Sequence, residues 1–85
     1  MVAAPRPGSP EWRCRLISEV TLQLLESEPG LTLCEGLRLI EAACQAVERM
    51  APEGRDAFHA ATLPRLQRAL LERFGIDPEP GNGFN

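Results

Sequence analysis

The sequence contains no lysine, so its nine basic residues are all arginines. Twelve acidic residues outnumber them, and the formal net charge of the 85-residue chain is −3. This weakly acidic balance argues against a general affinity for phosphate backbones, although it permits a local basic face. We attribute the missing lysines to the coding bias of a GC-rich genome rather than to chemistry.

Paired cysteines and long apolar runs are also missing. The three cysteines, Cys14, Cys34 and Cys44, form an odd set without a C-x-x-C pair, whereas a disulfide scaffold needs an even number. We interpret them as reduced thiols that act as small apolar residues in the core or at an interface. No apolar run reaches the length of about 18 residues that spans a membrane, and residues 1–8 lack the apolar stretch of a signal peptide. These absences predict a cytoplasmic protein that does not bind membranes.

Capping residues mark the boundaries of three expected helices. Ser9 before Pro10 is typical of a helix start, because the hydroxyl accepts from a free backbone N–H and proline fits the first turn. Thr32 and Glu35 match the capping box, in which each side chain satisfies a backbone N–H. Gly75 fits the left-handed position that closes a helix. We expect helices at 10–28, 32–50 and 53–74 in a helical domain over 10–76, with a flexible arm at 1–9 and a flexible tail at 77–85.

Pro64 falls inside the third expected helix. In one version the helix starts near Pro52 and kinks; in the other it breaks at Thr62, whose hydroxyl caps a fresh helix. Either version is favoured over a straight rod, and short connections favour antiparallel neighbours. The predicted fold class is therefore all-α: a small three-helix bundle, up-down-up, with a third helix kinked or broken near Pro64.

The expected middle helix carries apolar residues on more than one face. They form two offset stripes at helical spacing, namely residues 33, 37, 40, 44 and 47 and residues 36, 39, 43, 46 and 50. Together these stripes make an apolar surface wider than a single neighbouring helix covers. The middle helix is therefore expected at the centre of the assembly.

The width of this surface predicts protein–protein contact, since a domain of this size tends to be marginal without a partner or a second copy. We expect a non-catalytic interaction module that acts as a homodimer or as an accessory subunit of a larger protein. Leu37, Ile40, Cys44 and Val47 would then be buried partly within the chain and partly against the partner. Alternatively, the two flanking helices cover both stripes, and a single chain buries this apolar surface without a partner.

Four residues are the candidate contacts with a protein partner: Trp12, Leu39, Ala43 and Phe58. Trp12 begins an apolar stripe that continues at residues 16, 20 and 24 of the first helix. Leu39 and Ala43 belong to the second stripe of the middle helix, where small residues allow close approach of another helix. Trp12 and Phe58 are large aromatic groups near helix ends. For Phe58 the alternative is that it plugs the bundle.

The last helix carries the alternative, basic surface. Arg65 and Arg68 are three residues apart and share a helix face, with Gln67 between them as a candidate reader of base edges. Together with Arg73 they support a second hypothesis, a small nucleic-acid-binding regulator whose last helix contacts the nucleic acid. Glu72 on the same face and the negative net charge oppose it.

No catalytic or metal-ligating pattern emerges from the sequence. His59 is the sole histidine, and Asp56 three residues earlier is placed to orient its ring, but no serine or cysteine occupies a neighbouring helical position to act as the nucleophile. Glu35, Glu41 and Glu48 share their strip with arginines, which is typical of a solvated face. The Glu-x-x-His motif of helical metal sites is missing. We expect no enzymatic activity, no metal and no cofactor.

Overall fold

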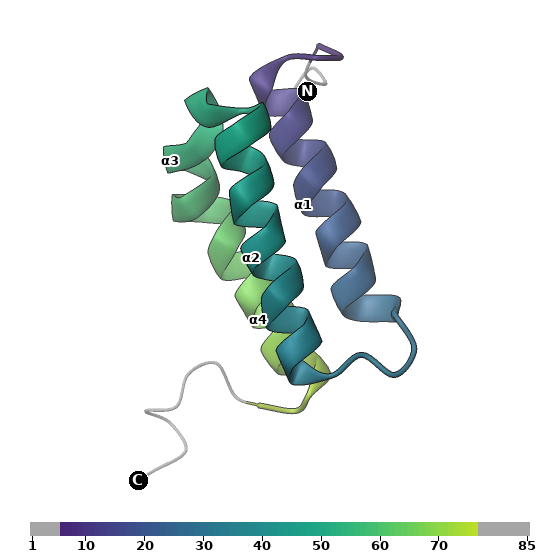
Figure 1. Cartoon of the computed structure of the whole chain (residues 1–85). Helices are drawn as coiled ribbons and strands as arrows, with labels where there is room; N and C mark the ends of the chain where they lie inside the picture. The colour runs from purple at the N-terminus through teal and green to yellow at the C-terminus, as the bar shows by residue number, and fades with distance from the viewer. Residues whose placement is uncertain (1–5, 77–85) are drawn as a thin grey trace, which may run out of the picture.

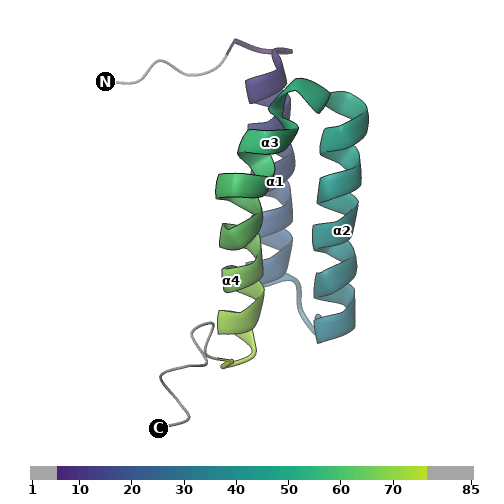
Figure 2. The same ribbon diagram turned by 90° about the vertical axis from the view of Figure 1, so that its left-hand side faces the viewer.

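The computed structural model describes residues 6–76, which form three helical rods packed side by side (Figure 1). The elements in chain order are α1 (Pro10–Ser27), α2 (Leu33–Met50), the 3-10 turn η1 (Pro52–Gly54), α3 (Arg55–Ala57), the π-helical segment η2 (Phe58–Thr62) and α4 (Leu63–Arg73). The last four elements follow one another along a single rod (Figure 2). The predicted all-α, three-helix fold is thus confirmed, and no strand occurs within 6–76. The predicted tail at 77–85 and most of the predicted arm lie outside the described residues.

The first two helices begin where their capping residues predict, with the hydrogen bonds that the sequence implies. The Ser9 hydroxyl accepts from the backbone N–H of Trp12 at 3.2 Å, and Pro10 opens α1. At the start of α2 the Thr32 hydroxyl accepts from the Glu35 N–H at 3.1 Å, and the Glu35 carboxylate accepts from the Thr32 N–H at 2.9 Å. The bond from the Thr32 backbone, followed by that from its side chain, lowers the pKa of Glu35 below its ordinary value.

The end of α4 is also closed as its residues predict. Gly75 adopts a left-handed conformation with a φ of 70°. Its N–H donates to the Glu72 carbonyl at 3.1 Å, and the Ile76 N–H donates to the Leu71 carbonyl at 2.9 Å. This pair of bonds is the Schellman motif, which satisfies carbonyls that the helix itself leaves free.

The third helix continues through Pro64 by means of a wide turn. The N–H of Leu63 donates to the carbonyl of Phe58, five residues earlier, which defines η2 as π-helical. Thr62 is in the right-handed helical conformation and its side chain makes no capping bond. The version in which Thr62 starts a fresh helix is therefore wrong, and the chain accommodates Pro64 through an irregular turn instead.

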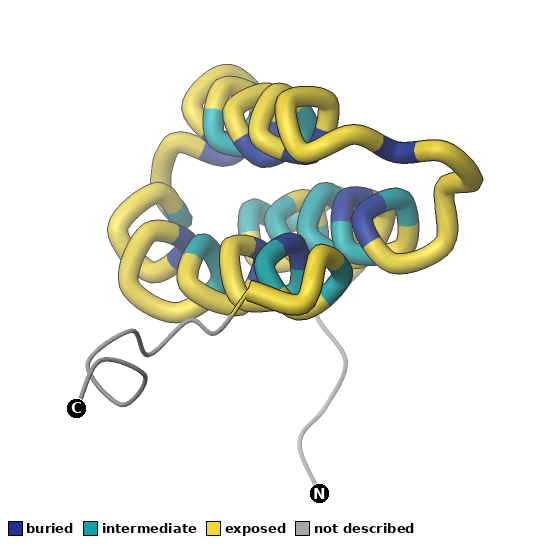
Figure 3. Tube along the Cα trace, turned by 90° about the horizontal axis from the view of Figure 1, so that it is seen from below, coloured by how far each residue is buried: buried dark blue, intermediate teal, exposed yellow. Residues whose placement is uncertain are grey.

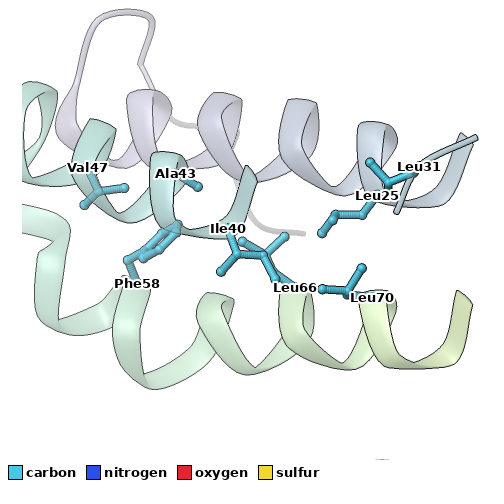
Figure 4. Packing of buried hydrophobic residues seen from close by; sticks show 8 residues of the cluster. All are labelled: Leu25, Leu31, Ile40, Ala43, Val47, Phe58, Leu66 and Leu70. Atoms are coloured by element: carbon cyan, nitrogen blue, oxygen red, sulfur yellow. The ribbon is translucent and has the colours of Figure 1, made fainter. Parts of the chain in front are cut away.

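The core lies between the three rods, where the inner side of each helix is buried (Figure 3). Gly36, Ile40, Ala43 and Val47 form the buried seam of α2, midway between the two predicted stripes. Eight residues make up the core cluster: Leu25, Leu31, Ile40, Ala43, Val47, Phe58, Leu66 and Leu70 (Figure 4). Because the seam runs between the stripes, residues on both of its sides retain exposed apolar surface.

Candidate protein interface

The apolar stripe of α1 lies largely outside the core. Leu16 and Val20 are 49% and 51% exposed, whereas Thr21 and Leu25 are the buried residues of this helix. A strict four-residue repeat drifts by about 40° per step around an α-helix, because the helix turns about 100° per residue. The stripe therefore winds around α1, and its last member, Leu24, is half-buried in the hollow that Leu31 and Leu39 also line.

An apolar groove runs between α1 and α2, which pack side by side (Figure 1). It is a hollow of about 280 Å³, to which α1 contributes Leu16, Ile17 and Val20 and α2 contributes Leu39, Ala42 and Ala46. The third helix contributes no residue to it. The groove thus opens on the face of α1 and α2 that the third helix leaves uncovered.

The two walls of this groove differ in height. The α1 wall carries the half-exposed side chains of Leu16 and Val20. The α2 wall carries Ala42 and Ala46, whose methyl groups leave the backbone of α2 close to the surface. Leu39 connects the groove to a second hollow at the α1–α2 turn, which Leu24 and Leu31 also line. The face therefore presents a ridge on α1 beside a trough on α2.

The structure places the four predicted contact residues in two different settings. Trp12 is partly exposed beside Leu16 and Glu19, and Leu39 is partly exposed in the groove. Ala43 and Phe58 are only 3% and 2% exposed, so both belong to the core of the single chain. Phe58 plugs the bundle rather than facing a partner, because the wide turn of η2 directs it inward. Only Trp12 and Leu39 offer surface to another molecule.

The four α2 residues that were expected to lie partly in the core and partly against a partner also differ in their burial. Ile40 and Val47 are buried within the chain, and Cys44 is half-buried against the core cluster. Leu37 is 54% exposed. The helix therefore has more apolar circumference than its two neighbours cover, as the two stripes predict.

The three arginines of the alternative hypothesis do not form one open basic face. Arg73 reaches across to the end of α1, where its Nη1 donates to the Leu25 carbonyl at 2.8 Å and its Nη2 donates to the Glu28 carbonyl. Arg65 lies along a polar hollow between α1 and α4 that two glutamates of α1 also line. Arg68 is exposed. Arg73 thus serves the fold, by binding carbonyls that the last turn of α1 leaves free.

Replacing Arg73 with glutamine is expected to lower the free energy of unfolding by about 1 to 2 kcal/mol, since two charge-assisted hydrogen bonds to backbone carbonyls are lost. Urea denaturation followed by circular dichroism measures the change. The matched control is Arg68→Gln on the same helix, where an exposed side chain predicts a change within about 0.5 kcal/mol. Equal losses of stability in both variants would contradict a stabilising role for the hydrogen bonds of Arg73.

The remaining polar candidates are dispersed over the surface. His59 is exposed, and its ring lies edge-on to Phe58 with 6.0 Å between the ring centroids. Glu48 pairs with Arg55 at 3.3 Å, and Glu35 belongs to the capping box. Residues 6–76 hold no group of three histidine, cysteine, aspartate or glutamate side chains that could bind a metal ion. Across the same residues no helix is both long and apolar enough to cross a bilayer.

The cysteines differ in their surroundings. Burial raises the pKa of the Cys14 and Cys44 thiols, and neighbouring glutamates raise it further. Cys34 is exposed. Raised pKa values keep the first two thiols protonated and weakly reactive at neutral pH, in keeping with their predicted role as small apolar residues.

Comparison with protein families, with curated proteins and with solved structures found no match for this chain. The groove between α1 and α2 is therefore interpreted from its own residues.

Proposed function

We propose that this protein is a small, non-catalytic helical interaction module of the cytoplasm that acts as a homodimer or as an accessory subunit of a larger protein. The observation that carries the proposal is the groove between α1 and α2, with Leu16 and Val20 half-exposed on one wall. Contiguous apolar surface of this kind is costly in water and marks binding sites on small domains. Covering it with a partner removes that cost.

The shape of the groove favours a helical partner. Ala42 and Ala46 are four residues apart and lie on one side of α2, so an approaching helix can come close to its backbone. Leu16 and Val20 repeat at the same four-residue interval on the opposite wall. An amphipathic helix laid along the groove would place its apolar side chains over the alanines and between the two aliphatic residues.

Site-specific photocrosslinking in cells that express the protein natively tests this proposal. A benzoylphenylalanine at position 16 is expected to yield a covalent adduct with a protein. The control places the same group at position 67, an exposed residue of α4 outside the groove, where no adduct is expected. Failure to form any protein adduct from position 16 would overturn the proposal.

A nucleic-acid-binding regulator that uses Arg65 and Arg68 is the alternative function. Because Arg73 is held by α1, this surface has one arginine fewer than the sequence suggested. Retention on heparin with a steep salt dependence would support the alternative, and elution without retention at low salt would count against it.

A further inference from the structure

We infer that the occupant of the groove is the same groove of a second copy of this chain, related to the first by a two-fold axis parallel to the helices. This inference rests on the proposed function, and it specifies the partner. A two-fold interface uses the same patch on both copies, so the patch must be complementary to itself. The groove between α1 and α2 meets that requirement in its shape and in its charge.

The ridge of α1 and the trough of α2 occupy the same stretch along the helix axes. α1 and α2 run in opposite directions, and the Arg13 Nη1 donates to the Met50 carbonyl at 2.8 Å at one end. At the other end Leu24 and Leu39 line the same hollow. Along this antiparallel pair, Leu16 comes level with Ala46 and Val20 with Ala42, which is consistent with the shared groove that all four residues line.

A two-fold axis parallel to the helices lays α1 of one copy over α2 of the other and leaves the position of each residue along the helix axis unchanged. Leu16 and Val20 of each copy then enter the trough above Ala46 and Ala42 of the other. An axis across the helices would instead stack ridge on ridge and leave the two troughs facing empty space. The parallel axis is therefore the one that fills both troughs at once, as close packing requires.

The charges along the edges of the face agree with this arrangement. Glu19 and Glu26 lie on the outer edge of α1 together with Arg15, which pairs with Glu19 at 3.6 Å, so this edge carries a net charge of −1. Arg38 lies at the end of the α2 wall beside Leu39 and Glu35, and Arg49 follows Ala46 by three residues on the same helix, so these three charged side chains sum to +1. The parallel axis sets the edge of net negative charge of each copy beside the wall of net positive charge of the other, whereas the axis across the helices pairs edges of like net charge.

Trp12 reports on this association, because it is the only tryptophan of the chain and precedes Leu16 by one helical turn. It is partly exposed in the single chain, in a shallow hollow with Leu16 and Glu19. Covering the ridge with a second copy takes its indole ring away from water. Its fluorescence emission is therefore expected to move to shorter wavelength as dimers form.

The first measurement is the mass of the full-length purified chain from micromolar to millimolar concentration, by light scattering after size exclusion. The mass is expected to rise towards twice that of one chain, with the Trp12 emission shifting in parallel. A single copy at millimolar concentration would overturn the self-pairing. If position 16 still crosslinks to a different protein, the interaction module survives with another partner; if it crosslinks to nothing, the proposed function fails as well.

A complementation experiment tests the geometry itself. Ala42→Leu fills the trough at an exposed position and is expected to weaken self-association at least about tenfold, because the larger side chain occupies the space that Val20 of the other copy enters. Val20→Ala lowers the ridge. A mixed dimer of the two variants has two ridge-to-trough contacts. In one, the leucine at position 42 meets the alanine at position 20 of the other copy, and in the other both residues are the original ones. The mixture is therefore expected to dimerise where Ala42→Leu alone does not.

Gln67→Leu is the matched control, because it adds an exposed leucine on α4 outside the groove. It is expected to associate like the original chain. Circular dichroism melts confirm that each variant folds, which the exposure of residues 20, 42 and 67 favours. A mixture of Ala42→Leu and Val20→Ala that remains monomeric would overturn the parallel two-fold arrangement.

Discussion

Replacing Phe58 with alanine is expected to lower the free energy of unfolding by about 3–5 kcal/mol. Phe58 is the largest fully buried side chain of the described residues, and its ring packs in the core cluster with Ile40 and Leu66 (Figure 4). Its removal loses the transfer free energy of the ring and leaves a cavity that the three rods can only partly close. Since the single core of a domain this small rarely supplies more than about 3–5 kcal/mol, the variant should be close to unfolding at room temperature.

Chemical denaturation followed by circular dichroism measures this loss. His59→Ala is the control: its side chain is the exposed neighbour of Phe58, and the expected change is within about 0.5 kcal/mol. If Phe58 faced a partner instead, its substitution would leave the isolated chain nearly as stable as before. A loss below about 1 kcal/mol for Phe58→Ala would therefore contradict the core position.

Replacing Gly36 with valine is expected to destabilise the fold by about 3 kcal/mol, at the upper end of the range for overpacking. A Cβ at this position would overlap with the Leu70 Cδ1 and lie 3.1 Å from its Cδ2. Leu70 is only 1% exposed, so its side chain cannot swing out into solvent. The gain in helix propensity from removing a glycine is below about 1 kcal/mol and does not offset the clash.

A double-mutant cycle assigns this loss to the contact with Leu70. In a Leu70→Ala background the space opposite Gly36 is open, so the additional cost of Gly36→Val is expected to fall below about 1 kcal/mol. Thermal or urea melts of the four chains provide the coupling free energy. Equal costs in both backgrounds would contradict the close approach of α2 and α4 at this point.

The helix boundaries could be predicted from the sequence because their causes are local. Ser9, Thr32 with Glu35, and Gly75 each satisfy backbone groups within a few residues, and the structure shows the bonds that these residues imply. The expectation that α2 lies at the centre is wrong, because the structure packs the three rods side by side, each against the other two, and leaves part of both apolar stripes of α2 exposed (Figure 1).

The parts that were not predictable depend on partners distant in sequence. The four-residue stripe of α1 indicates an apolar face but does not say how the helix is rotated about its axis, and the structure turns Leu16 and Val20 outward. Arg73 lies in an arginine-bearing helix like any surface residue, and only the fold brings it to the Leu25 carbonyl, 48 residues away. The groove depends on how α1 and α2 are each rotated about their own axes. Of the residues that line it, Leu39 was therefore the only predicted contact residue that proved to be partly exposed at the surface.

The wide turn of η2 has a consequence for the spacing of the core. Phe58 and Leu66 are eight residues apart, and a regular α-helix would separate their directions by about 80°. A π-helical turn contains more residues, so the same eight residues rotate less and both side chains reach the interior (Figure 4). With one alanine fewer in this stretch, an unbroken α-helix would hold the two within about 20° of each other. The wide turn thus accommodates one residue more than a regular helix would over the same rotation, and a variant that lacks one of the two alanines is expected to keep the same interior.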